Sequence, residues 1–284
     1  MINLKFVKLQ FKNIKIILII SSILFFLLTI LAITLKYFSP STDIDVSDAA
    51  SFVSFVMYGY GCCLIMIFPY SIITTHILLT KEIKEGYFAC WLVLPMSRKA
   101  VLNSKIFTLI SSIIILNVGS LFLQLILFSL VYKDFNQQNQ INLVLTSFSF
   151  LFLWILWSFI VWVISCYFDK SGVSISILSF ISILFLLFGI LSFTGEISGT
   201  SNPNLEKLKY LKFLTIISFF NSALNFADLP HSSLNIIIAE PLQPKSLDFC
   251  WQLPTMFVLS SGLFSLGNWI FIKKKFITII YLKM

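Results

Sequence analysis

Residues 16–35 read IILIISSILFFLLTILAITL, a run of twenty residues without Asp, Glu, Lys or Arg. A helix rises about 1.5 Å per residue, so about 20 apolar residues cross a hydrocarbon core of about 30 Å. The run follows a basic stretch but exceeds the apolar core of a cleavable signal peptide, and no small-residue cleavage site follows it. We therefore expect a retained membrane-spanning helix.

The rest of the chain repeats this pattern. Of its 284 residues, 58% are hydrophobic and 11% charged, against about 25% charged in an ordinary soluble domain. The mean hydropathy is +0.96. We expect an all-α polytopic membrane bundle of six transmembrane helices, forming a single transmembrane domain over 1–284. The expected spans are 16–35, 52–77, 106–132, 143–168, 173–193 and 251–272.

The basic residues predict how the chain lies in the membrane. Short loops rich in Lys and Arg stay in the cytoplasm. If the N-terminus is inside, most of the 20 basic residues fall on the inner side while most acidic residues fall outside, which favours an N-in, C-in arrangement. The inner set would be Lys5, Lys8, Lys12, Lys15, Lys81, Lys84, Arg98, Lys99, Lys105, Lys170, Lys273, Lys274, Lys275 and Lys283.

An external loop is expected over 195–250, before the sixth span. It contains four prolines and one apolar patch at 213–220. The patch is too short to cross a bilayer, and a seventh crossing would move the basic cluster 273–275 outside. We expect short interfacial or re-entrant helices there instead, anchored by Lys207, Lys209 and Lys212.

The segment after the second span, 80–105, reads TKEIKEGYFACWLVLPMSRKAVLNSK. Apolar side chains recur in it at three- and four-residue spacing, which predicts an amphipathic helix on the inner membrane surface. Pro95 would end this helix, because proline lacks an N–H donor and clashes with the preceding turn.

This segment resembles the membrane subunits of type-2 ABC exporters. That family has an E-x-x-x-G-T stretch, a Leu-Leu pair, P-x-S-R and then a Lys. The chain departs from the pattern at Tyr87 and Val93, where Thr and Leu are usual. The matching residues are Glu82, Gly86, Leu92, Pro95, Ser97, Arg98 and Lys105.

The resemblance implies that segment 80–99 is a coupling helix held by a separate ATPase. It implies docking contacts at Glu82 and Glu85, a bend or close-packing position at Gly86, a turn at Pro95, and an ion-pair or phospholipid anchor at Arg98. A solvated loop face with Arg98 as an inner-side marker is the alternative. The expected ATPase-coupling set is Glu82, Glu85, Gly86, Trp91, Pro95, Ser97, Arg98 and Lys105.

Two further sets follow from the spans. Small residues opening the fifth span suit close helix approach, either to a second permease subunit, as in the resembled family, or within the chain. They are Gly172, Ser176 and Ser179. Three tryptophans of the fourth span could line a path for an amphipathic substrate, although lipid-facing anchors are the commoner use of such residues. They are Trp154, Trp157 and Trp162.

Several classes of protein are excluded by what the sequence lacks. The expected spans contain no acidic residue, and His76 lies at a span end, which argues against ion-coupled transport and intramembrane proteolysis. No G-x-x-x-x-G-K-[ST] loop is present, so we expect no nucleotide site in this chain, with ATP and Mg²⁺ bound by the partner. The five cysteines predict neither a disulfide nor a metal site, and the scattered lysines predict no nucleic-acid partner.

The sequence thus favours the permease subunit of an ATP-driven exporter in a bacterial cell membrane, with an ATPase, a second permease subunit and lipids as partners. A charge-free, aromatic interior suits a lipid-like, drug-like or peptide cargo better than a small ion. Two alternatives remain open from the sequence: a non-transporting immunity or sensor subunit that works with an ATPase, and a channel that needs none.

Overall fold

The computed structural model describes residues 3–37, 66–85, 97–131, 137–168, 170–198, 207–216 and 246–273. Within these ranges every regular element is helical and no strand occurs. The expectation of an all-α fold is confirmed for this part of the chain.

In the described ranges, five helices are long and apolar enough to cross a membrane. Their lengths follow from uninterrupted apolar sequence, in agreement with five of the six expected spans. They are α1 (Leu4–Tyr37), α7 (Arg98–Val131), α8 (Gln137–Tyr167), α9 (Ser171–Ser198) and α12 (Ser246–Lys273).

All five helices begin earlier than the expected spans, and the difference is largest for α1 and α7. The expected spans open at residues 16 and 106, whereas α1 begins at Leu4 and α7 at Arg98. Apolar length marks only the part of a helix inside the hydrocarbon, and both helices continue through the basic residues before it. The side chain of Asn3 accepts the N–H groups of Lys5 and Phe6, at 3.1 and 3.2 Å, and so caps α1.

The expected second span, 52–77, is described only from residue 66 onward. Its described part is the helix α4 (Phe68–Thr75), followed without a break by the π-helical turn η2 (His76–Thr80) and the short helix α5 (Lys81–Lys84). Residues 52–65 lie outside the described ranges, so the structure supports five spans and leaves the six-span topology untested.

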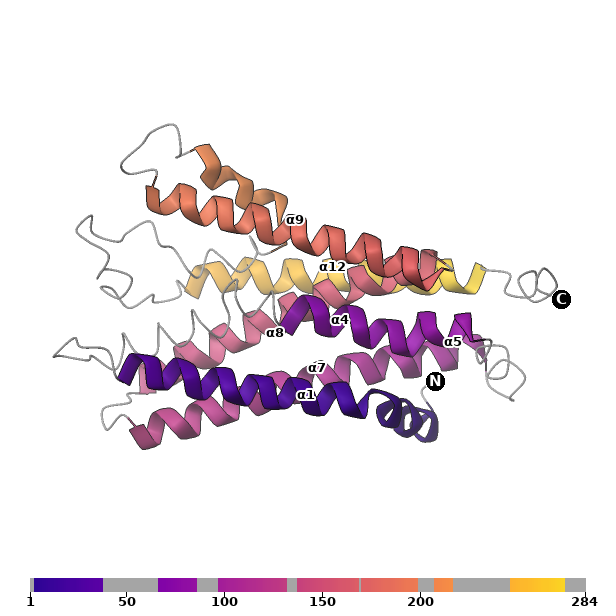
Figure 1. Cartoon of the computed structure of the whole chain (residues 1–284), viewed down its shortest axis with the longest axis horizontal. Coiled ribbons are helices and arrows are strands. Elements are labelled where there is room, and N and C mark those ends of the chain that lie inside the picture. The colour runs from indigo at the N-terminus through magenta and orange to yellow at the C-terminus, as the bar shows by residue number, and fades with distance from the viewer. Residues whose placement is uncertain are drawn as a thin grey trace.

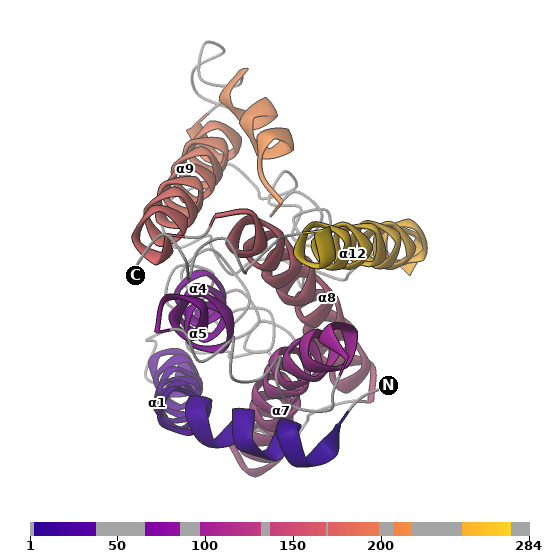
Figure 2. The same cartoon turned by 90° about the vertical axis from the view of Figure 1, so that its right-hand side faces the viewer.

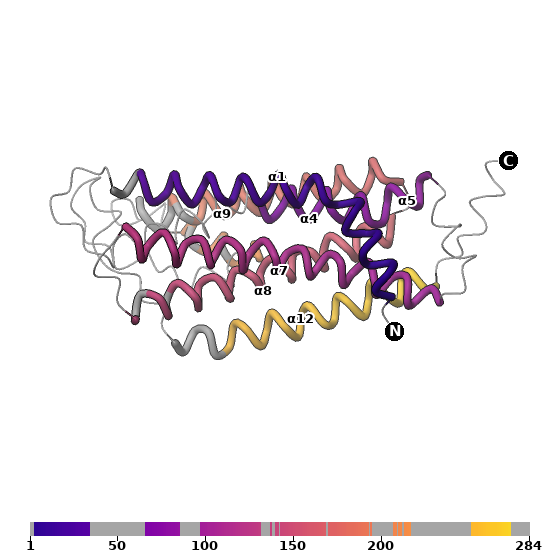
Figure 3. Tube along the Cα trace, turned by 90° about the horizontal axis from the view of Figure 1, so that it is seen from below, coloured from indigo at the N-terminus to yellow at the C-terminus, as the bar shows by residue number. Residues whose placement is uncertain are grey.

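The helices run up and down along one axis (Figures 1 and 3). The start of α1, the helix α5, the start of α7, the turn from α8 to α9 and the end of α12 all lie at the same end of the bundle. We call this the basic end, because these element ends carry the described members of the expected inner set. They are Lys5, Lys8, Lys12, Lys15, Lys81, Lys84, Arg98, Lys99, Lys105, Lys170 and Lys273.

Helix α8 is the centre of the bundle (Figure 2). It packs against α12, α7, α4 and α9. In its most apolar stretch 67% of residues are buried, against 22–33% in the other four long helices. The outer helices therefore present large apolar side chains outward, as a protein surrounded by lipid requires.

The core around α8 is aromatic. Trp154 contacts Phe25 and Tyr70, with ring centroids 5.8 and 5.4 Å apart, and Trp157 contacts Phe68 at 4.7 Å. Tilted and edge-on ring pairs of this kind contribute beyond their buried area. Trp154, Trp157 and Trp162 are all fully buried, so the interpretation as lipid-facing anchors is wrong.

Polar side chains join the spans inside this core. The indole N–H of Trp154 donates to the Ser71 hydroxyl at 3.0 Å, and Ser71 lies 2.9 Å from the Ser158 hydroxyl. The Asn117 amide donates to the Ser147 hydroxyl at 3.0 Å. Hydrogen bonds across membrane helices hold their rotation and register, and these tie α4 and α7 to α8.

The contact of α12 with α8 depends on one glycine. A Cβ atom at Gly267 would lie 3.0 Å from Cδ1 of Trp162 and 3.4 Å from Cγ2 of Val163. Glycine therefore permits the two helices to approach closely. At Gly262, on the same helix, an added Cβ would meet nothing within 4 Å.

The expected external loop is described at its two ends and in one internal piece. Residues 195–198 belong to α9, residues 246–250 belong to α12, and the 3₁₀ helix η3 (Lys207–Leu214) packs against α9. Half of the apolar patch at 213–220, residues 217–220, lies outside the described residues, so its expected interfacial or re-entrant helix is untested.

Candidate coupling site at the basic end

The candidate site lies where α4, η2 and α5 approach the start of α7. The run from Phe68 to Lys84 continues the axis of the second span into the expected coupling segment, and α7 returns from Arg98 into the bundle. Residues 86–96, which include Gly86, Trp91 and Pro95, lie outside the described ranges. The structure therefore describes the two ends of the expected coupling segment, at α5 and at the start of α7.

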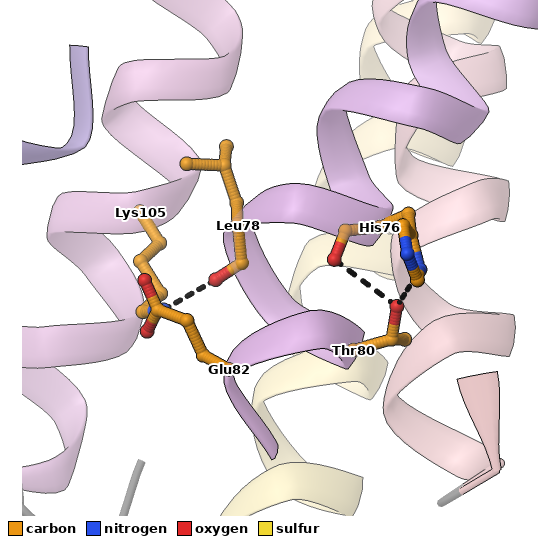
Figure 4. Close-up of polar contacts among 5 residues, drawn as sticks. All are labelled: His76, Leu78, Thr80, Glu82 and Lys105. Carbon is orange, nitrogen blue, oxygen red and sulfur yellow. Dashed lines mark hydrogen bonds and ion pairs between the residues drawn. The ribbon is translucent and has the colours of Figure 1, made fainter. Parts of the chain in front are cut away.

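A buried ion pair joins these ends (Figure 4). The Lys105 ammonium of α7 donates to the carboxylate of Glu82 in α5 and to the backbone carbonyl of Leu78 in η2. Lys105 is fully buried and Glu82 is 6% exposed. The π-helical turn shifts the backbone bonding pattern at the point where Leu78 meets the lysine.

The energetics of this arrangement are those of a buried charge pair. Taking both ions out of water is costly, and their mutual attraction offsets that cost only while both remain. Removing one partner of such a pair costs about 3–5 kcal/mol, because it leaves an uncompensated buried charge. Movement of α5 is therefore coupled to movement of α7.

A second polar contact lies on the other side of η2 (Figure 4). The Thr80 hydroxyl donates to the His76 carbonyl at 3.1 Å, and its oxygen lies 2.5 Å from Nδ1 of His76. A hydroxyl has one proton, so with that proton on the carbonyl Nδ1 of His76 is the donor to Thr80. This contact stabilises the π-helical turn, whose Leu78 carbonyl accepts the bond from Lys105.

The start of α7 is fixed by two serines. The Ser97 side chain accepts the N–H of Ala100 at 3.2 Å, which makes Ser97 the N-cap of α7. The Ser104 hydroxyl accepts the backbone N–H of Asn3 at 3.0 Å and so ties the start of α1 to α7. The three element ends at this site are thus joined by specific polar contacts.

The expected coupling residues fall into distinct environments. Glu85 is exposed and Arg98 is half-buried. Glu82 is buried against Lys105, so its carboxylate does not lie on a free surface, contrary to the environment that a docking contact implies. The sequence placed Glu82 and Lys105 in one motif but missed that they pair with each other.

A signal for this pairing was present in the sequence. Lys105 lies immediately before an apolar run, at a depth where an unpaired ammonium is costly. Its neutralisation required a carboxylate, and the inner side offered few. Glu82, 23 residues earlier, is the one that the fold supplies.

The residues expected to pack against a second subunit lie at the start of α9. Gly172 and Ser176 are exposed and Ser179 is half-buried. Ser174, on the opposite face, lies 3.2 Å from the Ser165 hydroxyl of α8. The exposed face is open to a partner, and its use in a dimer stays a prediction.

Metal chemistry finds no support at this site. In the part of the chain that the structure describes, no group of three His, Cys, Asp or Glu side chains could hold a metal ion. Among the charged groups described at the site, Glu82 and Lys105 join two helices.

The fold and the site define a multi-pass α-helical membrane protein with a charge-paired junction at one end. Residues 1–185 match the family described as "ABC-2 family transporter protein", and the chain belongs to this family. The match covers the junction and the helices that form it. A comparison with curated proteins finds no match.

Family membership settles the class of the protein. It is a membrane subunit, or permease, of an ABC transporter. The resemblance drawn from segment 80–105 is thereby confirmed.

Proposed function

We propose that the chain is the permease subunit of an ATP-driven exporter, with the basic end and both termini in the cytoplasm. In this proposal segment 80–99 is a lever that a separate ATPase subunit moves. Support comes from the gathering of lysines at one end, because the cytoplasmic side retains such loops. The export direction follows the type-2 ABC exporters that the motif resembles.

The observation that carries the proposal is the buried contact among Glu82, Lys105 and Leu78. A lever moves the spans only if it is attached to them. Here α5, at the entrance to the segment, is joined to α7, the helix at its exit. A force applied to the segment would reach both helices together.

The two glutamates would then have different tasks. Glu82 acts inside the permease as the anchor of the lever. Glu85 is exposed and would meet basic groups of the ATPase, where a charge affects the choice and rate of association. Arg98, half-buried beside the cap of α7, suits an ion pair with the partner or with a lipid phosphate.

Assembly would involve two permease subunits, identical or paralogous. The exposed face of α9 begins with Gly172 and Ser176 and continues through Phe180 and Ile183, which are 63% and 60% exposed. Small residues at one end permit close backbone contact, and large apolar ones beyond them supply packing area.

The cargo would be amphipathic, lipid-like, drug-like or peptidic. In the described spans the polar groups of the core are hydroxyls, amides and indoles, and the ion pair of Lys105 with Glu82 lies at the basic end. The path past Trp154, Trp157 and Trp162 stays a proposal, and it requires a conformational change because all three side chains are buried here.

The direct test is to reverse the charge of Glu85 in the complex with its ATPase. Glu85→Lys should weaken assembly and lower ATP hydrolysis in proteoliposomes, because it opposes the partner's basic groups. Lys207→Glu, an exposed charge reversal on η3, is the matched control and should change neither. Unchanged assembly and activity in Glu85→Lys would refute the docking role.

A second test separates export from sensing. Replacing the catalytic glutamate of the ATPase should abolish ATP-dependent movement of a fluorescent lipid or lipophilic dye in the same proteoliposomes. Equal movement without ATP, or in vesicles that contain this chain alone, would contradict the proposed mechanism.

A further inference from the structure

The N-terminal part of α1 turns across the basic end instead of following the axis of the bundle (Figures 2 and 3). Since the spans lie along the membrane normal, this part runs along the membrane surface. Its start is held on α7 by the bond from the Asn3 N–H to Ser104. The turn is therefore a fixed feature of the fold.

An open concavity of about 680 Å³ lies on the inner side of this turn. All of its lining residues belong to α1. Four are lysines and three are apolar, and none is acidic. They are Lys5, Lys8, Leu9, Phe11, Lys12, Lys15 and Leu18.

The four lysines carry like charges that the described protein does not neutralise. All four are exposed, and the one ion pair found among the described residues is that of Lys105 with Glu82. Four ammonium groups gathered in one concavity repel one another and create a positive potential. An anion in the concavity would relieve the repulsion.

The apolar lining indicates what kind of anion fits. Leu9, Phe11 and Leu18 lie among the lysines. Directly beyond them, α1 exposes a stripe of large apolar side chains along one face: Ile16, Ile20, Ile23 and Leu27, which are 72%, 52%, 53% and 55% exposed. A ligand that is anionic at one end and apolar along its length would match both features.

We propose that this concavity binds the headgroup of an anionic phospholipid, whose acyl chains lie along the exposed stripe of α1. The lysine stems pack beside the glycerol region while their ammonium groups contact the phosphate. The site does not depend on the proposed direction of transport, because it requires only that the chain lie in a membrane.

The test is native mass spectrometry of the full chain in a neutral detergent with equal amounts of phosphatidylglycerol and phosphatidylcholine. The chain should retain phosphatidylglycerol in preference. Each lysine near an anionic lipid contributes about fivefold in affinity. Lys8→Gln with Lys12→Gln should therefore lower phosphatidylglycerol retention about thirty-fold, while Lys8→Arg with Lys12→Arg should keep it.

The matched control is Lys170→Gln with Lys273→Gln, which removes two exposed lysines of the same end outside the concavity. Its retention should equal that of the native chain. An equal loss in this control, or equal retention of the two lipids by the native chain, would overturn the proposal.

A competition arm excludes a soluble anion as the ligand. Glycerol 3-phosphate at the same concentration as the lipid should not displace it, since the apolar stripe contributes to binding. Displacement would overturn the lipid assignment. If the double Gln variant does not fold, the single variant Lys12→Gln gives the answer, with about a fivefold loss expected and no loss contradicting the site.

Discussion

Two groups of charges lie at the same end of this molecule and differ in every physical respect. Lys105 and Glu82 are buried and paired between two helices. Lys5, Lys8 and Lys12 lie on one helix, are exposed, and face an open concavity. The first group joins parts of the protein, whereas the second is available to something outside it.

The difference teaches how one residue type serves two purposes in a membrane protein. A lysine below the interface is tolerated only with its counter-charge, so its replacement should affect folding. A lysine at the interface keeps its charge in water, so its replacement should affect binding and leave folding alone.

The largest effect is expected for Lys105→Met. The change leaves the Glu82 carboxylate buried without its partner and should lower the free energy of unfolding by about 3–5 kcal/mol. The double change Glu82→Gln with Lys105→Met should recover most of the loss, because no buried charge remains. Unfolding in mixed neutral-detergent and SDS micelles measures both.

The control for this pair is Lys84→Met, which changes an exposed lysine of α5, the short helix that carries Glu82. It should stay within about 0.5 kcal/mol of the native chain. If Lys105→Met is as mild as Lys84→Met, the contrast between buried and exposed lysines is wrong.

The same contrast can be made without charge at the α8–α12 contact. Gly267→Leu places a side chain against Trp162 and should destabilise by about 1–3 kcal/mol through overpacking. Gly262→Leu, on the open side of the same helix, should be neutral or slightly stabilising. Thermal unfolding in detergent distinguishes them, and equal midpoints would contradict the close approach.

A smaller effect is expected at the cap of α7. Ser97→Ala removes the side-chain acceptor of the Ala100 N–H, which also bonds the Ser97 carbonyl at 2.9 Å, and should cost about 1 kcal/mol. Ser97→Asp should retain the native value, since a carboxylate accepts the same bond. Hydrogen exchange at the first turn of α7 measures the change locally, and protection unaltered in Ser97→Ala would argue against the cap.

The smallest effect on folding is expected for Lys8→Gln with Lys12→Gln. Without anionic lipid, this variant should unfold within about 0.5 kcal/mol of the native chain, because both lysines are exposed. The SDS titration used for Lys105→Met applies unchanged. A loss near that of Lys105→Met would show that the concavity lysines also stabilise the fold.

The spans could be predicted from the sequence because crossing a membrane is a local property. A run such as 16–35 meets the length requirement by itself, and five such runs became long helices. The sequence did not predict that α1 begins as early as Leu4 and α7 as early as Arg98, since a helix can continue beyond the hydrocarbon. Apolar length carries no information about that continuation.

The inner faces of the helices could not be predicted in the same way. In lipid both faces of a span are apolar, so hydrophobic periodicity does not separate the core from the surface. Trp154, Trp157 and Trp162 therefore allowed a lipid-facing interpretation, yet all three are buried against neighbouring helices. Only the packing of α8 among the other elements decides their position.

The sequence named residues of the candidate site but did not predict how two of them pair. The motif identified Glu82, Ser97 and Lys105 through resemblance. The pairing of Glu82 with Lys105 depends on the return of α7 beside η2, which is a long-range property. The roles expected for Gly86, Trp91 and Pro95 stay predictions, because these residues lie outside the described ranges.

Site-directed cross-linking tests the central claim most directly. In a chain whose five cysteines are replaced by Ala, a cysteine at position 85 (Glu85→Cys) is compared in native membranes with one at position 210 on η3 (Tyr210→Cys). The account predicts that Glu85→Cys alone cross-links to a subunit with a P-loop sequence. A P-loop subunit captured from Tyr210→Cys instead, or labelling of Glu85→Cys by an impermeant maleimide from outside the cell, would contradict it.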